Sequence, residues 1–553
     1  MAKHLIIGGV AAGMSAAARL RRLDEDAEIV VLERGDYVSY ANCGLPYYVG
    51  NEISQRDDLL LQTPASFKRR FNVDVRVRNE AVAVDPAGKA VTVRNTLSGE
   101  STEERYDTLL LAPGGSPFRP PLRGIDHPAI HTLWTIPDTD KIKGMVDCGS
   151  VSRAVIVGGG FIGLEMAENL HMRGVKVTLV EMAPQVMNVI DPEMAALVHR
   201  ELRKNGVELH LNETVTGFGQ GAGERVLVQL GSGDSIDADL VLLSIGVVPN
   251  TGFLGDSGIE LGPRGHIIVD QYLRTNMPDV YAAGDAIEVV NPFTGKKTAV
   301  PLAGPANKQG RIAAGNIKGT TIRSYFSTMG TAIAKVFDVA VGVTGATEKF
   351  CRAESIPYHS VIIHPNHHAG YYPGAALLTF KLLFCPDSRR VLGAQVIGRE
   401  GVDKRVDVIA TAIQAKMTVD DLTEIEHAYA PPYSSAKDPV NMIAFVAQNI
   451  LNGLTNSISY DAVQRVLEEG AFLLDVRTPG EFAAGTIAGA VNISVDTLRD
   501  NLAKLPRERT ILIFCKVGLR GYIASRILAG HGFSNYVNLS GGYDTYSCAA
   551  KFL

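Results

Sequence analysis

Residues 153–181 read RAVIVGGGFIGLEMAENLHMRGVKVTLVE and decide the fold. An apolar run ends in a glycine-rich turn, a helical segment follows, and a second apolar run closes on Glu181. Gly158, Gly160 and Gly163 stand in full GxGxxG register. Backbone amides at such a helix N-terminus can hold a pyrophosphate, while the Glu181 carboxylate would repel a ribose 2′-phosphate. The stretch therefore predicts a dinucleotide-binding βαβ unit that prefers NADH to NADPH.

The same pattern opens the chain at residues 4–35, HLIIGGVAAGMSAAARLRRLDEDAEIVVLERG. Gly8 would make the tight turn and Gly13 the close contact between helix and strand. Glu33, 20 residues after Gly13, can accept a hydrogen bond from an adenosine ribose hydroxyl. The usual middle glycine is Val10, so this copy is weaker, and an ordinary βα turn is the alternative. Two such sites in one chain imply two dinucleotides.

A third segment, LRTNMPDVYAAGDAIE (273–288), indicates which dinucleotide belongs where. It resembles a signature of the two-dinucleotide-binding flavoproteins, and the resemblance places Asp285 on the ribityl chain of FAD. Segments 106–117 and 239–250 match the strand-to-glycine turns of the same superfamily. We therefore expect FAD in the first site and NADH in the second. The predicted FAD domain comprises 1–112 and 250–324, and the predicted NADH domain comprises 113–249.

Length and composition limit the class of protein. A chain of 553 residues should hold three or four domains. Its net charge of −5, without a long single-sign tail, argues against a nucleic-acid partner. Six cysteines without a CxxC pair favour a reducing cytoplasm. The N-terminus has some features of a signal peptide, but its glycine spacing fits a nucleotide site better, and no apolar run approaches the roughly 18 residues of a membrane span.

The segment expected to carry the reaction is SYANCGLPYY (39–48), which contains one cysteine, Cys43. The next cysteine is Cys148, so we expect Cys43 to pair with an external thiol or to adopt an oxidised sulfur state. A buried, inert cysteine is the alternative. The competent nucleophile is the thiolate, so the site must stabilise negative charge through amides, the flavin or bound cations.

SYANCGLPYY, the leading GGVAAG and HHAGYYPGA (367–375) together resemble the coenzyme A disulfide reductase and NADH-dependent persulfide reductase family. The resemblance implies that Cys43 forms a mixed disulfide with coenzyme A or attacks a persulfide, and that NADH restores it through FAD. Ser39 and Asn42 would line the cysteine. Ser15, Arg19 and Arg22 would meet the phosphates of coenzyme A. For Arg19, Arg21 and Arg22, a solvated helix face is the alternative.

The same resemblance implies a homodimer. Residues 325–450 would form an α+β dimerisation domain that brings Tyr371 and Tyr429 of the partner subunit to the sulfur. Interface packing is the alternative for both, and Tyr372 or Tyr433 could take their place. PLAGPANKQGR (301–311) would begin a helix with Ala303 at the flavin. His364, His367 and His368 lack acidic or sulfur ligands nearby, so we expect a loop there and no metal.

Residues 458–553 resemble a rhodanese sulfurtransferase domain with an α/β fold. Cys515 to Arg520 reads CKVGLR directly after a buried strand, so successive amides can curl around the sulfur as an anion nest. A six-residue loop fits sulfur, whereas related phosphatases use one residue more. Arg520 would close the loop, while Asp475 and Arg477 look structural.

The predicted function is NADH- and FAD-dependent reduction of coenzyme A persulfide, polysulfide or coenzyme A disulfide at Cys43. A relay in which Cys515 accepts sulfur for Cys43 is a hypothesis drawn from the fusion. Two rivals remain open. An NADH oxidase or peroxidase would use Cys43 as a sulfenic acid, but such relatives carry a histidine in the first glycine loop, where this chain has Ala11. A slow redox-sensing or sulfur-trafficking protein would turn over well below about one per second.

Overall fold

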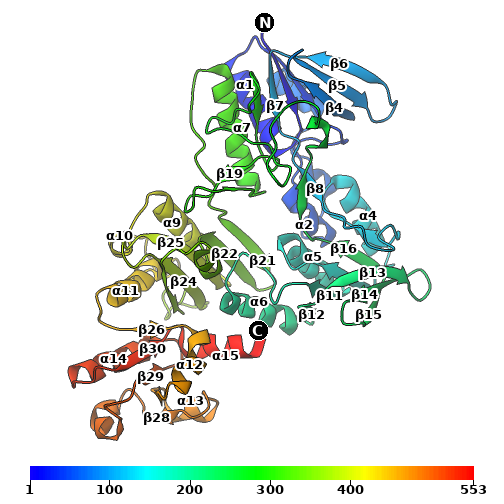
Figure 1. Cartoon of the computed structure of the whole chain (residues 1–553). Helices are drawn as coiled ribbons and strands as arrows, with labels where there is room; N and C mark the ends of the chain where they lie inside the picture. Colours follow the sequence, from blue (N-terminus) through cyan, green and yellow to red (C-terminus); the bar gives the residue numbers. More distant parts are fainter. Residues whose placement is uncertain (553) are drawn as a thin grey trace. The chain divides into compact units, whose positions relative to one another are not determined.

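The computed structural model describes residues 1–552, which form two compact units (Figure 1). The first unit contains Met1–Val180 and Glu213–Gly330. The second contains Glu181–Asn212 and the chain from Thr331 onward. Glu181 therefore begins the second unit, although the strand that carries it begins in the first.

The first unit opens with a parallel sheet in the order β18-β7-β1-β2-β3. Its central strands are apolar, and every residue of β1 after Lys3 is buried. Helix α1 (Ala11–Leu23) connects β1 to β2 and lies beside α7 (Ala303–Lys318). A Cβ atom on Gly310 of α7 would lie 2.2 Å from the Ala12 carbonyl oxygen, so these helices touch backbone to backbone. The strands are β1 (Lys3–Ile7), β2 (Glu28–Leu32), β3 (Asp74–Arg76), β7 (Thr108–Leu111) and β18 (Val280–Ala282).

A second parallel arrangement repeats this design, with neighbouring strands β11, β10, β16 and β9. Helix α5 (Phe161–Met172) connects β10 to β11, as the sequence predicts for residues 153–181. The strands are β9 (Ile130–His131), β10 (Arg153–Val157), β11 (Lys176–Glu181) and β16 (Leu240–Leu243), and α4 spans Ile136–Asp147.

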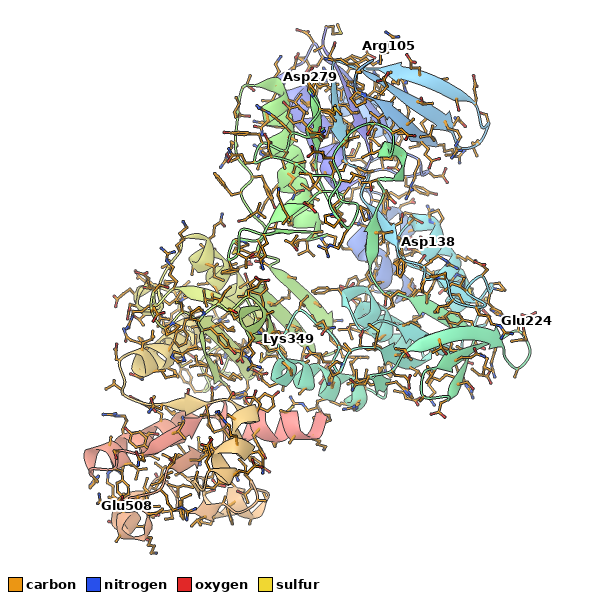
Figure 2. All side chains as sticks on the ribbon, in the orientation of Figure 1. Arg105, Asp138, Glu224, Asp279, Lys349 and Glu508 are labelled. Carbon is orange, nitrogen blue, oxygen red and sulfur yellow. The ribbon has the colours of Figure 1, made fainter. Side chains whose placement is uncertain are left out.

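Two antiparallel sheets and several short elements complete the first unit. Charged side chains such as those of Arg105 and Asp279, labelled in Figure 2, are exposed. One sheet contains β4 (Asn79–Asp85), β5 (Ala90–Asn95) and β6 (Ser101–Arg105), and the other contains β13 (Val215–Gln220), β14 (Val226–Leu230) and β15 (Ser235–Ala238). The short elements are η1 (Asn42–Gly44), α2 (Leu45–Val49), η2 (Arg56–Leu59), α3 (Pro64–Phe71), β8 (Gly115–Pro117), β17 (Val247–Pro249), η3 (Gly252–Leu254), β19 (Val289–Val290) and β20 (Lys297–Thr298).

The second unit contains α6 (Pro192–Lys204), β12 (Glu208–Leu211) and an antiparallel sheet in the order β21-β22-β25-β24-β23. Strand β25 is the middle strand of this sheet, and all eight of its residues are buried. The strands are β21 (Ala332–Val336), β22 (Val339–Gly345), β23 (His359–Ile363), β24 (Leu378–Phe384) and β25 (Val391–Gly398). The helices are α8 (Glu348–Ala353), α9 (Val402–Gln414), α10 (Val419–Glu424) and α11 (Pro439–Leu451).

The last part of the second unit has its own parallel sheet, in the order β26-β30-β29-β27-β28. Apolar residues fill both faces of β29, and all four of its residues are buried. The elements are β26 (Ser457–Ile458), η4 (Tyr460–Ala462), α12 (Val463–Glu468), β27 (Phe472–Asp475), α13 (Pro479–Ala483), β28 (Val491–Asn492), η5 (Leu498–Lys504), β29 (Ile511–Phe514), α14 (Leu519–Gly530), β30 (Tyr536–Leu539) and α15 (Gly542–Phe552). Within residues 1–552, no helix is both long and apolar enough to cross a bilayer.

Candidate active site

The first glycine loop has the geometry of a nucleotide-binding turn. Gly8 has φ +104°, and a Cβ atom there would lie 1.9 Å from the Ala112 carbonyl oxygen. Gly13 packs equally tightly, since its Cβ atom would lie 1.9 Å from the Gly8 oxygen. Val10, in place of the middle glycine, is the N-cap of α1. The Glu33 carboxylate directly after β2 accepts from the Gly9 amide at 2.8 Å, so acid and loop meet as predicted.

The second glycine loop leaves its helix end open. Gly160 is the N-cap of α5, without a side-chain hydrogen bond at that end, and no atom lies within 4 Å of a Cβ built on it. Gly158 and Gly163 flank this open position in the turn. An anion there would meet the free amides of the first helical turn. The residues of this loop therefore fit a pyrophosphate group.

Asp285 lies after β18, where the signature segment meets α7. The Gly284 amide donates to Gln309 Oε1 of α7 at 2.7 Å, which fixes the turn. Burial raises the pKa of Asp285 to about 6. Ala303 is the first residue of α7, whose N-terminus has no side-chain cap. A half-buried carboxyl group and an open helix end lie in one unit with the first glycine loop, which suits a flavin dinucleotide.

Cys43 lies in η1, at the start of the short segment that leads into α2. Its side chain is exposed and forms no disulfide. Ser39 has φ +45°, a conformation that non-glycine residues rarely adopt, and its amide donates to the Gly9 oxygen at 2.9 Å. Asn42 precedes the cysteine in the same turn. The cysteine loop is thus bound to the first glycine loop.

The electrostatic surroundings of Cys43 are acidic. Partial burial raises the pKa of the Cys43 thiol, and the carboxyl groups of Glu165 and Asp285 raise it further. Burial also raises the pKa of Glu165 to about 7, while a 3.4 Å hydrogen bond from Tyr47 Oη opposes that rise. The sequence interpretation missed Glu165. Its signal was an acid two residues after Gly163, on a helix otherwise rich in apolar residues.

The three residues expected at the phosphates of coenzyme A share one face of α1. Ser15, Arg19 and Arg22 are four and three residues apart, which is helical spacing. Ser15 Oγ donates to Asn307 Oδ1 of α7 at 2.5 Å, Arg19 is half-buried and Arg22 is exposed. Arg21 is buried and donates to backbone oxygens, including that of Ala27 at 2.8 Å, so it has a structural role.

The structure brings the two predicted tyrosines together in the second unit. The hydroxyl oxygens of Tyr371 and Tyr429 lie 3.3 Å apart, and the residues are 77% and 48% exposed. Tyr372 and Tyr433 are also exposed, so all four candidates reach the surface. Of the nearby histidines, His367 and His368 are buried and His364 is half-buried. His364 bonds Thr379 and Thr545, His367 bonds Ala376, and His368 packs edge-on against Tyr372.

The CKVGLR loop follows β29 directly. The Gly518 amide points to Cys515 Sγ at 3.1 Å, as an anion nest requires. Arg520 donates through both terminal nitrogens to Glu481, each at 2.7 Å. Glu481 was also missed in the sequence. Asp475 and Arg477 form a buried ion pair at 2.6 Å, which supports the structural role expected for them.

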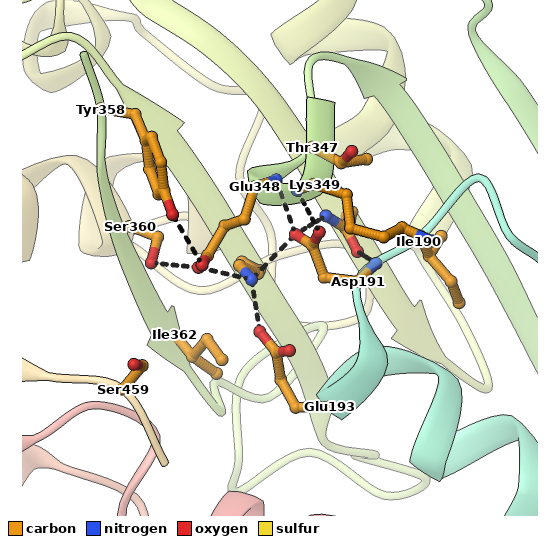
Figure 3. Close-up of polar contacts among 12 residues, drawn as sticks. Ile190, Asp191, Glu193, Thr347, Glu348, Lys349, Tyr358, Ser360, Ile362 and Ser459 are labelled. Atoms are coloured by element: carbon orange, nitrogen blue, oxygen red, sulfur yellow. Dashed lines mark hydrogen bonds and ion pairs between the residues drawn. The ribbon is translucent and has the colours of Figure 1, made fainter. Parts of the chain in front are cut away.

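A metal centre has one geometric candidate among residues 1–552, the carboxylates of Asp191, Glu193 and Glu348. The ammonium group of Lys381 already lies among them, 2.8 Å from Asp191 and 2.7 Å from Glu348. Figure 3 shows these acids converging: Asp191 precedes α6, Glu193 lies in its first turn and Glu348 begins α8. The lysine supplies the positive charge that a metal would otherwise bring.

Known protein families match all parts of this geometry. Residues 2–310 match the pyridine nucleotide-disulphide oxidoreductases, residues 331–439 match the dimerisation domain of that family, and residues 459–548 match the rhodanese-like domain. The chain belongs to the pyridine nucleotide-disulphide oxidoreductase family. This membership confirms the predicted fold class, and with it an enzyme that uses FAD and a pyridine nucleotide.

Individual relatives agree with this assignment. The crystal structure of reduced CoADR-RHD from Bacillus anthracis is 46% identical, has a TM-score of 0.97, and covers 100% of this chain and 98% of its own. A NAD-dependent persulfide reductase from A. fulgidus is 38% identical with a TM-score of 0.92, covering 98% and 100%. The coenzyme A disulfide reductase of Staphylococcus haemolyticus is 35% identical over 81% of this chain and 100% of its own length. The family prediction made from SYANCGLPYY and HHAGYYPGA is therefore confirmed, as is reduction of sulfur–sulfur bonds.

Proposed function

We propose that this chain reduces coenzyme A persulfide, polysulfide or coenzyme A disulfide with NADH, and that Cys43 is its nucleophile. The observation that carries the proposal is the hydrogen bond from Ser39 to Gly9, which fixes the loop of a lone cysteine against a dinucleotide-binding turn. Relatives named for coenzyme A disulfide and persulfide reduction support the substrate class.

The proposed chemistry needs one thiolate. Cys43 attacks one sulfur atom of the substrate, its new bond forms as the old sulfur–sulfur bond breaks, and the first thiol leaves. Bound FAD would carry two electrons from NADH to the sulfur on Cys43. The second thiol or hydrosulfide then leaves and Cys43 is restored, with one NADH and one proton consumed.

The remaining site residues keep the roles predicted from the sequence. We also propose the boundaries of four domains: residues 1–112 with 250–324 bind FAD, 113–249 bind NADH, 325–450 form the dimerisation domain and 458–553 form the rhodanese-like domain. We assign Gly8, Gly13, Glu33, Asp285 and Ala303 to FAD, Gly158, Gly160, Gly163 and Glu181 to NADH, and Ser15, Arg19, Arg22, Ser39 and Asn42 to coenzyme A.

A homodimer with the tyrosine pair at the partner's cysteine is part of the proposal. Its support is the exposure of Tyr371 and Tyr429 on a domain of the dimerisation family. Hydroxyl groups 3.3 Å apart could donate together to one leaving sulfur. A reducing, cytoplasmic setting is also proposed, because all six cysteines are free.

Cys515 is proposed to carry sulfane sulfur, with Arg520 closing the loop. The amide of Gly518 supports this role, because it donates to Sγ and would stabilise a thiolate or persulfide. In the proposed relay, sulfur passes from Cys515 to Cys43 through coenzyme A or a related thiol.

Mass spectrometry of the intact, FAD-loaded protein tests the assignment of Cys43. A reductant-sensitive coenzyme A adduct should map to Cys43. Cys43→Ser should reduce NADH-dependent turnover of every sulfur substrate at least about a hundredfold. Cys148→Ser is the matched control, because Cys148 is also free and exposed. Oxygen or peroxide consumption exceeding disulfide turnover would instead identify the oxidase function, and turnover below about one per second would identify a sensor.

A further inference from the structure

Helix α15 begins against the backbone of the Cys515 loop. The Tyr543 amide donates to the Cys515 carbonyl oxygen at 2.8 Å, and the Asp544 amide donates to the Lys516 oxygen at 3.0 Å. Gly542 has φ +62°, and a Cβ atom there would lie 2.6 Å from the Cys515 oxygen. Loop and helix are thus in direct backbone contact, so the loop cannot shift without moving the start of α15.

The other end of α15 is bound to α6. The Phe552 carbonyl oxygen lies 2.8 Å from Nδ1 of His199, a fully buried residue of α6, and the two helices lie beside each other (Figure 1). On the other side of the ring, the Val186 amide donates to His199 Nε2 at 3.1 Å. An amide can only donate, so Nε2 accepts and Nδ1 carries the proton given to Phe552. Burial lowers the pKa of His199, which keeps the ring neutral and both bonds in place.

Val186 belongs to the loop that leaves β11 directly after Glu181. The end of that loop is also held, because the Asp191 amide donates to Gln395 Oε1 at 2.7 Å and Lys381 binds the Asp191 carboxylate. Figure 3 shows this buried anchor at the start of α6. His199 therefore connects the segment that follows the proposed NADH-selecting acid to the helix that supports Cys515.

We propose that α15 and His199 couple sulfur loading on Cys515 to dinucleotide binding at Glu181. The inference rests on the proposed roles of these two residues. In the loading step, the Cys515 thiolate attacks the outer sulfur of a low-molecular-weight persulfide. A bond forms to Cys515, the donor's sulfur–sulfur bond breaks, and the donor leaves as a thiol with the persulfide proton.

Loading changes the hydrogen bonding of the loop. The Gly518 amide now donates to Cys515 Sγ, and an added outer sulfur would compete for it. Turning the Lys516 and Val517 amides toward that outer sulfur would also move the Cys515 and Lys516 carbonyl groups, which accept from α15, because each of these amides shares a planar peptide unit with one of them. A helix transmits such a shift along its axis, and His199 passes it to Val186. By thermodynamic reciprocity, dinucleotide binding changes the loading equilibrium by the same factor.

Binding of tetrahydro-NADH, which cannot donate hydride, measures the coupling in full-length, FAD-loaded Cys43→Ser protein. This background removes Cys43, and because exposed thiols such as Cys148 remain, peptide mapping after treatment with glutathione persulfide verifies that the added sulfur is on Cys515. We expect the Kd to differ at least about fivefold between loaded and unloaded protein, the lower end of usual coupling. His199→Ala should reduce the difference to less than about twofold. His210 is a half-buried histidine of β12 that bonds Glu208 at 3.1 Å, and His210→Ala should leave the difference unchanged.

A chain ending at Lys551 provides a second test that leaves the buried ring of His199 intact. It removes the Phe552 acceptor and should also abolish the difference in Kd. Equal Kd values for loaded and unloaded protein, or a full difference in the truncated chain, would overturn the coupling. Glu181→Ala distinguishes a failure of the coupling from a failure of the proposed NADH site. If this variant binds tetrahydro-NADH normally, the proposed NADH site is wrong. If it weakens binding while loading has no effect, the site stands and the coupling alone is refuted.

Discussion

Glu165→Gln should make Cys43 more reactive at alkaline pH. Burial raises the pKa of Glu165 from its ordinary 4.5 to about 7. One pKa unit is about 1.4 kcal/mol, so ionising this carboxyl costs roughly 3 kcal/mol more in the folded protein than in water. Because the folded pKa is the raised one, the stabilisation by protonated Glu165 is complete below about pH 4.5 and is lost as the pH rises through about 7.

The same titration reaches the nucleophile. Partial burial is the largest cause of the raised pKa of the Cys43 thiol. Above pH 7 the ionised carboxylate of Glu165 raises that pKa further. A nearby like charge is worth on the order of 1 kcal/mol, so its removal should increase the thiolate fraction about five- to tenfold at pH 8. Asp285 remains as the other carboxyl acting on Cys43 in the variant.

Alkylation of Cys43 by iodoacetamide, quantified by peptide mapping from pH 5 to 10, measures this effect in the FAD-loaded protein without counting the exposed Cys148. The wild type should show two inflections and Glu165→Gln one, at lower pH. Glu165→Asp, which keeps a carboxyl group, should retain both. Tyr47→Phe removes a hydrogen bond that lowers the pKa of Glu165, so the first inflection should move to higher pH. Identical profiles for the wild type and Glu165→Gln would refute the reasoning.

Three further changes test other parts of the molecule. Lys381→Met leaves three buried carboxyl groups without their cation, so the free energy of unfolding of the second unit, measured in urea, should fall by about 3–5 kcal/mol. A decrease below about 1 kcal/mol would contradict this. Glu181→Ala should raise KM for NADH about tenfold and improve the relative use of NADPH in steady-state assays. Glu481→Gln should lower persulfide transfer by Cys515 about tenfold, because Arg520 loses both of its bonds to Glu481. Arg520 lowers the pKa of Glu481 to about 2, so the ion pair should persist, and persulfide transfer by the wild type should stay constant, down to about pH 4. A loss of transfer that begins above pH 5 would contradict this role of the ion pair.

Local backbone geometry made much of the fold predictable. The segment AAGMSAAARLRRL predicts a helix, and α1 spans those same residues, Ala11–Leu23. The tight turn at Gly8 and the CKVGLR loop are each determined by a few consecutive residues. A Cβ atom at Gly8 would clash with the backbone, and an extra residue would widen the CKVGLR loop. Chemistry that depends on such turns, including dinucleotide binding and the Cys515 nest, can therefore be read from short motifs.

Chemistry that depends on distant partners could not be read in this way. Lys381 is 188 residues from Glu193, and neither shows its partner in the local sequence. Arg520 and Glu481 are 39 residues apart and belong to different elements. The pKa of Glu165 depends on burial, which appears only when α5 is packed. Tyr371 and Tyr429 were named from motifs, and their separation of 3.3 Å was not predictable from either one.

The two proposed sulfur carriers differ in how the protein treats negative charge. At Cys515 a backbone amide donates to Sγ, and the arginine closing the loop is held by Glu481. At Cys43 partial burial raises the thiol pKa and two nearby carboxyl groups raise it further, so stabilisation of that thiolate depends on bound cofactor or substrate. Sulfane sulfur should therefore be captured first at Cys515 and reach Cys43 only when the reductase site is loaded. Coupling through α15 and His199 would favour this sequence of steps, because it links the capture of sulfur at Cys515 to the binding of NADH.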